Sequence, residues 1–143
     1  MSAYRILCVD DNRDSSELTS LVLQTAGEDY SVTTVNTAEY ALETIKKQAF
    51  DLFILDYRIP ESSGVEICRN LRQKGLKAPI MFFTAMAYPD NRKAAMEAGA
   101  NEYLVKPNDF EKLPQTVKKL LSDKSYALKS EPVIETKVFN GIY

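Results

Sequence analysis

Apolar and polar positions are distributed along this chain so that four short apolar runs each end on a residue capable of chemistry. The runs are residues 6–9 before Asp10 and Asp11, 52–55 before Asp56, 80–83 before Thr84, and 103–105 before Lys106. Nearly continuous apolar runs are typical of parallel strands that are buried on both faces. Because the carboxyl ends of parallel strands meet at one edge of an open sheet, we expect these polar side chains to share one crevice.

Segments with helical periodicity separate the apolar runs. Capping boxes, in which an N-cap residue precedes a glutamate by three positions, predict three helix starts: Asp14 with Glu17, Asn36 with Glu39, and Ser63 with Glu66. Pro89 suits the first turn of a fourth helix, and Leu113 or Pro114 begins a fifth. Glycine stops are expected after the first, third and fourth helices, at Gly27, Gly75 and Gly99.

A fifth strand is predicted at residues 31–35, and its two threonines favour an edge of the sheet. Strict alternation of five strands with five helices predicts an α/β fold with a doubly wound five-stranded parallel sheet, flanked by helices on both faces. The strand that ends on Asp10 is expected near the middle of this sheet. The domain is predicted to span residues 1–123.

Residues 124–143 fall outside this alternation and form a predicted C-terminal tail. Between Pro132 and Phe139 the tail mixes apolar, charged and β-branched residues, which favours an extended segment that docks on a surface or a partner. A plain disordered tail is the alternative, because chain termini are commonly mobile.

The composition is that of a globular protein, with 143 residues of which 45% are hydrophobic and 27% charged. A net charge of −2 supplies no drive toward nucleic acid or an anionic membrane, and no run approaches the ~18 apolar residues of a membrane span. Cys8 and Cys68 suit buried positions in a reducing compartment, and the chain has no histidine to complete a cysteine metal site. Because the N-terminus has no signal-peptide pattern either, we predict a cytoplasmic protein.

Three carboxylates at one edge of the sheet carry a chemical consequence. Asp10, Asp11 and Asp56 would repel one another and raise each other's pKa unless a cation lay among them. A hard, oxygen-binding cation such as Mg²⁺ relieves this repulsion, and it typically takes one or two carboxylates together with phosphate oxygens and waters. With the hydroxyl of Thr84 and the ammonium of Lys106 nearby, the sequence predicts a phosphoryl-transfer site in which Asp56 is the nucleophile.

These residues resemble the receiver domain of two-component response regulators, in particular a chemotaxis-type single-domain regulator. The resemblance covers residues 4–122, and its motifs recur along that whole length: Val9-Asp10-Asp11, Leu55-Asp56-Tyr57-Arg58-Ile59-Pro60 with Gly64 four beyond the proline, Phe83-Thr84-Ala85, and Val105-Lys106-Pro107. It implies a flavodoxin-like fold, in which the five strands lie in the order 2-1-3-4-5.

The resemblance also implies roles for the acidic residues. Asp56 is expected to accept a phosphoryl group from a histidine kinase or a phosphotransfer protein. Asp10, Asp11 and Asp56, with the backbone carbonyl of Arg58, are expected to bind Mg²⁺ or Mn²⁺. Apart from its own phosphorylation and dephosphorylation, the protein is expected to catalyse no reaction.

Further roles follow for the other residues of the site. Thr84 and Lys106 are expected to contact the phosphoryl oxygens, and the Lys106-Pro107 peptide is cis in the family. Thr84 and Tyr103 would act as a switch that signals to a protein partner through the fourth helix, the fifth strand and the fifth helix. Arg58 and Met86 are expected to set the lifetime of the phosphoryl group, because Met86 is at best a weak acceptor for an attacking water and the long Arg58 side chain can hinder its approach. A homodimer is left open, and no direct contact with nucleic acid or membrane is expected.

Bland interpretations exist for each residue taken alone. Lys106 could be a solvated strand end, Tyr103 an ordinary packed aromatic, and Thr84 a β-branched strand residue. The sequence also departs from the family pattern at Ile59, which replaces a frequent methionine, and at Asn108, which replaces an apolar residue after Lys-Pro. The second departure makes the packing of the loop after Pro107 an open question.

Two other functions compete with a single-domain switch. Small phosphohydrolases also use an aspartyl nucleophile with Mg²⁺, but they usually carry a second aspartate where this chain has Arg58. The chain could instead be the receiver portion of a longer regulator with a DNA-binding or enzymatic output domain. Residues 122–143 show no helix-turn-helix and no basic stripe.

Overall fold

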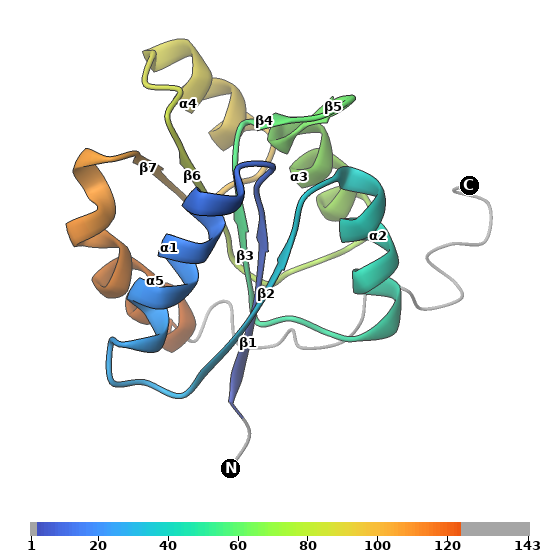
Figure 1. Ribbon diagram of the computed structural model, residues 1–143. Coiled ribbons are helices and arrows are strands. Elements are labelled where there is room, and N and C mark those ends of the chain that lie inside the picture. The colour runs from blue at the N-terminus through green and yellow to red at the C-terminus, as the bar shows by residue number, and fades with distance from the viewer. Residues whose placement is uncertain (1–2, 124–143) are drawn as a thin grey trace.

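Five parallel strands form one sheet in the computed structural model, which describes residues 3–123. The strand order is β2-β1-β3-β6-β7, and the helices pack against both faces of the sheet (Figure 1). The strands are β1 (Tyr4–Val9), β2 (Tyr30–Val35), β3 (Leu52–Leu55), β6 (Ile80–Thr84) and β7 (Glu102–Val105). The α-helices are α1 (Arg13–Gln24), α2 (Ala38–Lys47), α3 (Gly64–Gln73), α4 (Pro89–Glu97) and α5 (Leu113–Ser122). The doubly wound α/β fold is therefore confirmed, and the tail predicted at residues 124–143 lies outside the described residues.

The register of the sheet aligns the carboxyl ends of its strands. Val9 at the end of β1 pairs with Val35 of β2 and with Leu55 of β3, and Thr84 at the end of β6 pairs with Val105 of β7. The predicted edge position of β2 is confirmed, while the central strand is β3 and β1 lies one place away from the centre. The polar residues that follow these strands consequently emerge at one edge.

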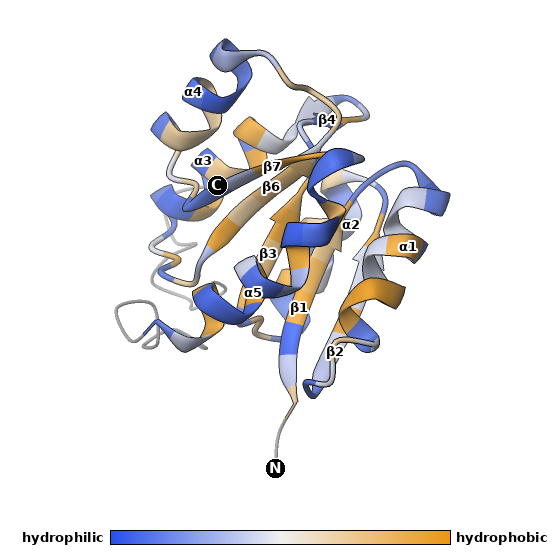
Figure 2. Cartoon of the chain, turned by 90° about the vertical axis from the view of Figure 1, so that its left-hand side faces the viewer, coloured by the Kyte–Doolittle hydropathy of each residue, from blue (hydrophilic) through white to orange (hydrophobic). Residues whose placement is uncertain are grey.

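Alternating side chains of the strands enter two separate core layers. Figure 2 shows the largely apolar colouring of the central strands. From β1, Leu7 and Val9 join the layer beneath α2, α3 and α4, whereas Ile6 and Cys8 join the layer beneath α1 and α5. β3 and β6 are buried along their whole length, which accounts for their unbroken apolar sequences. Both cysteines are free and buried, as predicted, and burial together with the nearby Asp10 charge raises the pKa of Cys8 to about 12.

The structure confirms one of the three predicted helix N-caps. Ser63 caps α3, since its hydroxyl accepts a hydrogen bond from the backbone N–H of Glu66 at 3.0 Å. The caps predicted at Asp14 and Asn36 are wrong. The α1 cap is Asn12, whose side-chain oxygen accepts from Ser15 N–H at 2.9 Å, and the α2 cap is Thr37, whose hydroxyl accepts from the N–H of Tyr40 at 3.0 Å.

The physical reason for both errors is the same. Asp, Asn, Ser and Thr are comparably good N-caps, so composition alone does not choose among neighbouring candidates. Asn12 and Thr37 have extended backbone angles and stand where the chain turns out of the sheet. Asp14 lies inside the first turn of α1, where its charge still favours the helix N-terminus.

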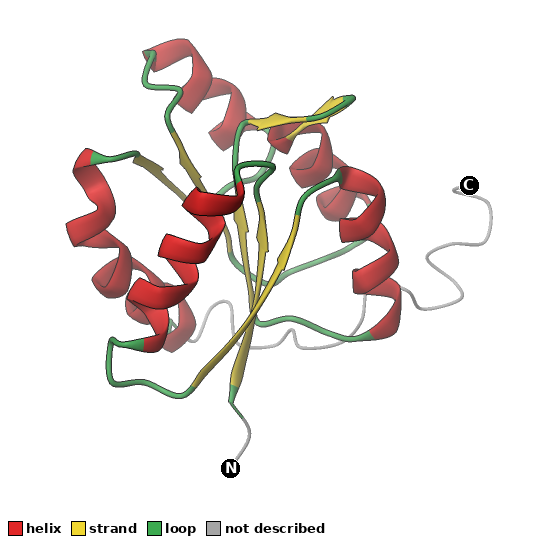
Figure 3. Cartoon of the chain, in the orientation of Figure 1, coloured by secondary structure: helices red, strands yellow, loops and turns green. Residues whose placement is uncertain are grey.

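A two-stranded hairpin that the sequence pattern did not predict follows β3 (Figure 3). Its strands β4 (Arg58–Ile59) and β5 (Ser62–Ser63) pair in an antiparallel manner around Pro60 and Glu61. Glu61 has a φ of 61°, a left-handed conformation that is uncommon outside glycine, asparagine and aspartate. The hairpin is too short to produce a periodic signal, yet it fixes the chain immediately after Asp56.

The loop after Pro107 forms a 3₁₀ helix, η1 (Asn108–Lys112). Asn108 is exposed, and the apolar contact expected at its position is made by Phe110 instead, whose ring meets that of Phe83 edge-on at 4.7 Å between centroids. The polar substitution therefore leaves the loop packed on the core. None of the helices in the described part of the chain combines the length and apolar character that a membrane crossing requires.

Candidate functional site

Asp56 lies at the centre of the cluster, directly after the fully buried strand β3. One carboxylate oxygen, Oδ1, accepts hydrogen bonds from the Thr84 hydroxyl at 2.7 Å and from the backbone N–H of Arg58 at 3.2 Å. The other, Oδ2, accepts from Nζ of Lys106 at 3.1 Å. The carboxylate is half-buried and held from two sides, which is the orientation that a fixed nucleophile requires.

Lys106 reaches this cluster from the end of β7, immediately before a cis peptide bond to Pro107. Its Nζ donates to Asp10 Oδ2 at 2.7 Å, to Asp56 Oδ2 at 3.1 Å, and to the hydroxyl of Ser15. Burial alone would lower the pKa of Lys106, but the hydrogen bond to Asp10 and the charges of Asp56 and Asp10 raise it above its usual value. The ammonium therefore stays charged at neutral pH, as a binding group for phosphate must.

The acidic pair splits into one buried and one exposed member. Asp10 is only 4% exposed, and its Oδ1 accepts from the backbone N–H of Asn12 at 2.9 Å. Asp11 is exposed and lines two open pockets, of about 440 Å³ toward α2 and about 480 Å³ toward the β4–β5 hairpin. The sequence brings both residues to the crevice, but only Asp10 is tied to Asp56, through the ammonium of Lys106.

The predicted metal ligands are thus near one another without forming a closed set. Among residues 3–123, no group of three His, Cys, Asp or Glu side chains is arranged to hold a metal ion. The ammonium of Lys106 lies within 3.1 Å of a carboxylate oxygen of both Asp10 and Asp56 and offsets one of their two negative charges. The carboxylate oxygens of Asp10, Asp11 and Asp56 are nevertheless the hard donors that Mg²⁺ prefers, so the residues present fit such an ion.

Thr84 connects Asp56 to the loop that follows β6. Its side chain is completely buried, and its hydroxyl donates to Asp56 while accepting from the backbone N–H of Met86 at 3.2 Å. One hydroxyl therefore joins the candidate phosphoacceptor to the chain leading into α4. Movement of this hydroxyl away from its present position would take an acceptor from the N–H of Met86.

Tyr103 is held inward against the same loop. Its ring is 4% exposed and stacks on Phe82 with centroids 5.7 Å apart, and its hydroxyl donates to the backbone carbonyl of Met86 at 2.7 Å. Arg92 of α4 donates to the Tyr103 carbonyl at 3.1 Å. Burial raises the pKa of Tyr103 to about 12, with smaller contributions from Tyr57 and Asp56.

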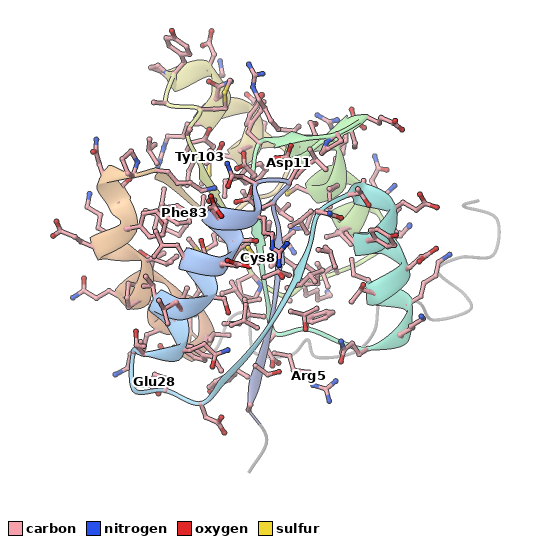
Figure 4. The ribbon with its side chains drawn as sticks, viewed as in Figure 1. Arg5, Cys8, Asp11, Glu28, Phe83 and Tyr103 are labelled. Atoms are coloured by element: carbon pink, nitrogen blue, oxygen red, sulfur yellow. The ribbon has the colours of Figure 1, made fainter. Side chains whose placement is uncertain are left out.

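Figure 4 shows how these side chains divide between the two ends of the sheet. Asp11 and Tyr103 lie at the carboxyl edge, Cys8 and Phe83 in the interior, and Arg5 and Glu28 at the opposite end. The Phe83 ring lies 5.5 Å from Nζ of Lys106 and forms part of the floor beneath the ammonium. The crevice is therefore polar at its mouth and aromatic at its base.

Gly64, the first residue of α3, lies close to the backbone of Asp56. A Cβ atom at this position would collide with the backbone carbonyl oxygen of Asp56 and would lie 2.7 Å from Cε2 of Phe82. The start of α3 can approach the candidate phosphoacceptor this closely only because residue 64 has no side chain. This is the physical reason for a glycine four positions after Pro60.

Two supporting residues carry no signal in the sequence. Ser15 contacts Lys106, and Asp109 accepts a hydrogen bond from the backbone N–H of Val105 at 2.8 Å, which fixes the chain just before Lys106. Neither was predicted, because serine in a first helical turn and aspartate in a loop are common. The two contacts become visible only in the folded structure, where Ser15 of α1 and Asp109 of η1 lie beside the end of β7.

Comparison with known proteins agrees with the arrangement of the site. The family model described as "Response regulator receiver domain" matches residues 6–118, a range that includes every residue of the crevice. The chain belongs to the response regulator receiver domain family. The flavodoxin-like fold expected of a receiver domain is the fold found here, with the strand order 2-1-3-4-5 when the five parallel strands alone are counted.

Curated relatives contain this receiver domain within longer chains. Response regulator MprA of Mycobacterium leprae is 38% identical over 117 residues, which make up 82% of this chain and 50% of that protein. Transcriptional regulatory protein ZraR of Klebsiella oxytoca is 35% identical over 131 residues, which make up 92% of this chain and 29% of that protein. The chain spans about half or less of the length of these relatives.

Solved structures of receiver domains superpose well on this one. A CheY-like response regulator receiver domain protein from Methanospirillum hungatei JF-1 has a TM-score of 0.77 at 28% identity and covers 87% of this chain and 97% of its own. The receiver domain of the sensor histidine kinase PA1611 from Pseudomonas aeruginosa PAO1 has a TM-score of 0.75 at 27% identity and covers 85% of this chain and 100% of its own. That receiver domain was crystallised with a magnesium ion coordinated in its active-site cleft.

Proposed function

We propose that this receiver domain is a phosphorylation-controlled switch that accepts a phosphoryl group on Asp56 from a phosphohistidine donor. The observation that carries the proposal is the convergence of Lys106 and Thr84 on the two oxygens of the Asp56 carboxylate, at 3.1 and 2.7 Å. The two carboxylate oxygens are thus approached by one charged and one neutral donor. A charged ammonium and a mobile hydroxyl are the groups that stabilise a phosphoryl group once it is attached.

The transfer itself requires little covalent chemistry from the protein. A carboxylate oxygen of Asp56 forms a bond to phosphorus while the bond from phosphorus to the donor imidazole nitrogen breaks, and the released imidazole takes up a proton. The transition state of phosphoryl transfer is loose, with little bonding from phosphorus to either the attacking or the leaving atom. Catalysis therefore comes mainly from positioning and electrostatic stabilisation. Lys106 donates to the phosphoryl oxygens, and Thr84 redirects its hydroxyl from the Asp56 carboxylate to one of them.

We further propose that Mg²⁺ or Mn²⁺ is bound by the side chains of Asp10, Asp11 and Asp56 with the backbone carbonyl of Arg58. When bound, the ion neutralises the charge that develops on the transferring phosphoryl group. The oxygen chemistry of these ligands and the magnesium described in the related PA1611 receiver domain support this assignment. Asp11 is exposed beside the crevice, where its carboxylate is accessible to an ion from solution.

The output is a change of surface. When Thr84 turns toward a phosphoryl oxygen, the loop at Met86 loses one of its contacts, and the inward hydrogen bond of Tyr103 to that loop is weakened. The surface formed by α4, β7 and α5 is therefore proposed to signal to a protein partner. No catalysis beyond phosphorylation and dephosphorylation of Asp56 is part of the proposal.

A second candidate function is favoured by the comparison of lengths. MprA and ZraR continue well beyond the region that matches, and the second candidate is accordingly a receiver domain that controls an output domain in a longer regulator. The phosphoacceptor chemistry is the same in both cases. They differ in whether the partner of the α4-β7-α5 surface is a separate protein or another part of one chain.

The experiment that tests the proposal uses a small phosphodonor such as phosphoramidate in the presence and absence of Mg²⁺. We expect the wild type to gain one phosphate, measured by intact mass, only when Mg²⁺ is present. Asp56→Asn should gain none, and Asp11→Asn should react slowly. Full phosphorylation of Asp56→Asn would contradict the assignment of the phosphoacceptor, and turnover of a phosphate ester would favour a phosphohydrolase instead.

A further inference from the structure

The ammonium of Lys106 has three N–H donors and three acceptors. Two of the acceptors are the carboxylates of Asp10 and Asp56, and the third is the hydroxyl of Ser15. Ser15 is half-buried in the first turn of α1. Its contact with Lys106 joins residues 91 positions apart and ties α1 to the end of β7.

The position of Ser15 is itself fixed. Its backbone N–H donates to the side chain of the cap residue Asn12 at 2.9 Å, and Asn12 in turn donates its own N–H to Asp10 at 2.9 Å. The hydroxyl is therefore mounted on a capped helix rather than on a free loop. On the other side, Asp109 fixes the backbone just before Lys106 through the N–H of Val105.

We propose that Ser15 is a positioning residue for phosphoryl transfer, which holds the ammonium of Lys106 toward Asp56 throughout the reaction. This inference rests on the proposed function. The other two acceptors of Lys106 change during that reaction, because Asp56 gains a phosphoryl group and Asp10 belongs to the proposed metal ligands. The neutral hydroxyl of Ser15 takes part in neither event, so it is the constant contact.

A constant contact matters because lysine is a flexible point charge. Its side chain is a flexible four-carbon stem, and its ammonium has no planar geometry that would orient it toward phosphate. Once Asp10 binds a cation, a Lys106 held by carboxylates alone would lose one attachment at the moment when its charge is needed. With Ser15 in place, Nζ remains over Asp56 and can donate directly to the incoming phosphoryl oxygen.

Four variants test the inference with matched chemistry. Ser15→Ala removes the hydroxyl, whereas Ser15→Thr keeps it and Ser15→Val has the shape of threonine without it. Ser16→Ala is the control, because the Ser16 hydroxyl lies on the same helical turn but donates to the backbone carbonyl of Arg13 at 3.0 Å instead of contacting Lys106. Amide NMR spectra of each variant establish that the fold is retained.

Two measurements are made on each protein in Mg²⁺. The rate of phosphorylation by phosphoramidate should fall about tenfold in Ser15→Ala and Ser15→Val, a barrier change of about 1.4 kcal/mol, and should be retained in Ser15→Thr and Ser16→Ala. The ¹⁵N signal of the Lys106 ammonium should broaden in Ser15→Ala and Ser15→Val alone. If Ser15 had only a structural role, the width of the Lys106 ¹⁵N signal would not depend on whether residue 15 carries a hydroxyl.

The inference is overturned if Ser15→Val reacts at the wild-type rate with an unchanged Lys106 signal, or if Ser15→Thr is as slow as Ser15→Val. Failure of the proposed function looks different. In that case the wild type itself gains no phosphate on Asp56, whatever residue stands at position 15.

Discussion

The Nε of Arg58 donates to the sulfur of Met86 at 3.3 Å, which links the hairpin after Asp56 to the loop after Thr84. Arg58 is exposed and Met86 half-buried, and both line the open pocket beside Asp11 and the β4–β5 hairpin. The contact was not predicted from the sequence, which indicated only that each residue lies two positions after a member of the site. It places a long cationic side chain and an apolar one side by side in this pocket, each two positions after a residue of the site.

This pairing leads to a prediction about the lifetime of phosphorylated Asp56. Hydrolysis needs a water in line with phosphorus, and thioether sulfur is too weak an acceptor to orient one. We also expect the long Arg58 side chain to hinder the approach of this water. We expect the Arg58→Asn, Met86→Glu double variant to lose its phosphate about tenfold faster than the wild type, a barrier difference of about 1.4 kcal/mol.

The measurement is the decay of the phosphorylated protein after removal of the phosphodonor, followed by intact mass. Met86→Leu is the control, because it keeps an apolar side chain of similar volume and introduces no group that could orient water. Its decay should match that of the wild type. A double variant that decays as slowly as the wild type, or more slowly, would contradict the argument about water access.

A second prediction concerns motion in the unphosphorylated protein. The inward hydrogen bond from Tyr103 to Met86 depends on a loop that a single hydroxyl, that of Thr84, ties to Asp56. Two arrangements of loop and ring that differ by a few kcal/mol would leave the active one as a minor population. Relaxation-dispersion NMR should detect exchange around Tyr103, in α4 and β7. Exchange confined to α1 and α5 would argue against this two-state element.

The raised pKa of Tyr103 gives a prediction for stability at high pH. Burial raises this pKa from 10.0 to about 12, so between pH 10 and 12 the unfolded chain loses the phenolic proton while the folded protein retains it. Because the folded state then binds more protons than the unfolded state, the free energy of unfolding must fall as the pH rises through this range. Tyr103→Phe removes the group from both states and should show a shallower decline in urea unfolding between pH 10 and 12. Equal slopes would show that Tyr103 titrates normally.

Arg72 provides a prediction about stability that is independent of the phosphoryl chemistry. Its guanidinium donates to the backbone carbonyls of Leu76, Ala78 and Gly99 and to the side chain of Asn101, at 2.8 to 3.0 Å. Removing the guanidinium takes one hydrogen bond from each of the three carbonyls, at roughly 1 kcal/mol each, whereas Asn101 still accepts from the N–H of Ile80 at 2.8 Å. Arg72→Met should therefore lower the free energy of unfolding by about 3 kcal/mol.

The matched control is Arg69→Met on the same helix. Arg69 is exposed, and within residues 3–123 its one ion pair is with Glu66 at 3.3 Å, an interaction expected to contribute roughly 0–1 kcal/mol. Urea unfolding of both variants measures the difference. If Arg72→Met is no less stable than Arg69→Met, the hydrogen-bond network of Arg72 does not hold α3 to the loop before β7.

The cap of α2 supplies a last prediction. Thr37 accepts from the N–H of Tyr40, whereas the neighbouring Asn36 makes no such contact within the described residues. Thr37→Ala should cost about 1 kcal/mol of stability and Asn36→Ala less than about 0.5 kcal/mol. Urea unfolding distinguishes them, and the opposite order would restore the cap at Asn36 that the sequence favoured.

The sequence alone determined the layers of this protein. The apolar runs before Asp10, Asp56, Thr84 and Lys106 are hydrophobic without interruption because both faces of a parallel sheet are covered by helices. Because a helical segment connects each strand to the next, and such connections are almost always right-handed, only a few strand orders are possible. Since the edge of the sheet at which strands end follows from their direction, the order of residues along the chain is enough to group these four polar positions.

Only the tertiary structure decided which of these groups touch. That Lys106 stands between Asp10 and Asp56 while Asp11 remains outside depends on distances of a few ångströms across strand ends that are up to 96 positions apart in the chain. The choice of Asn12 over Asp14 as a cap, the hairpin after Asp56, and the contacts of Ser15 and Met86 depend in the same way on where the backbone turns. Periodicity reports which face of an element is buried, but it carries no information about the direction of a single side chain in a loop. For that reason the fold followed from the pattern of residues, and the details of the site followed from their packing.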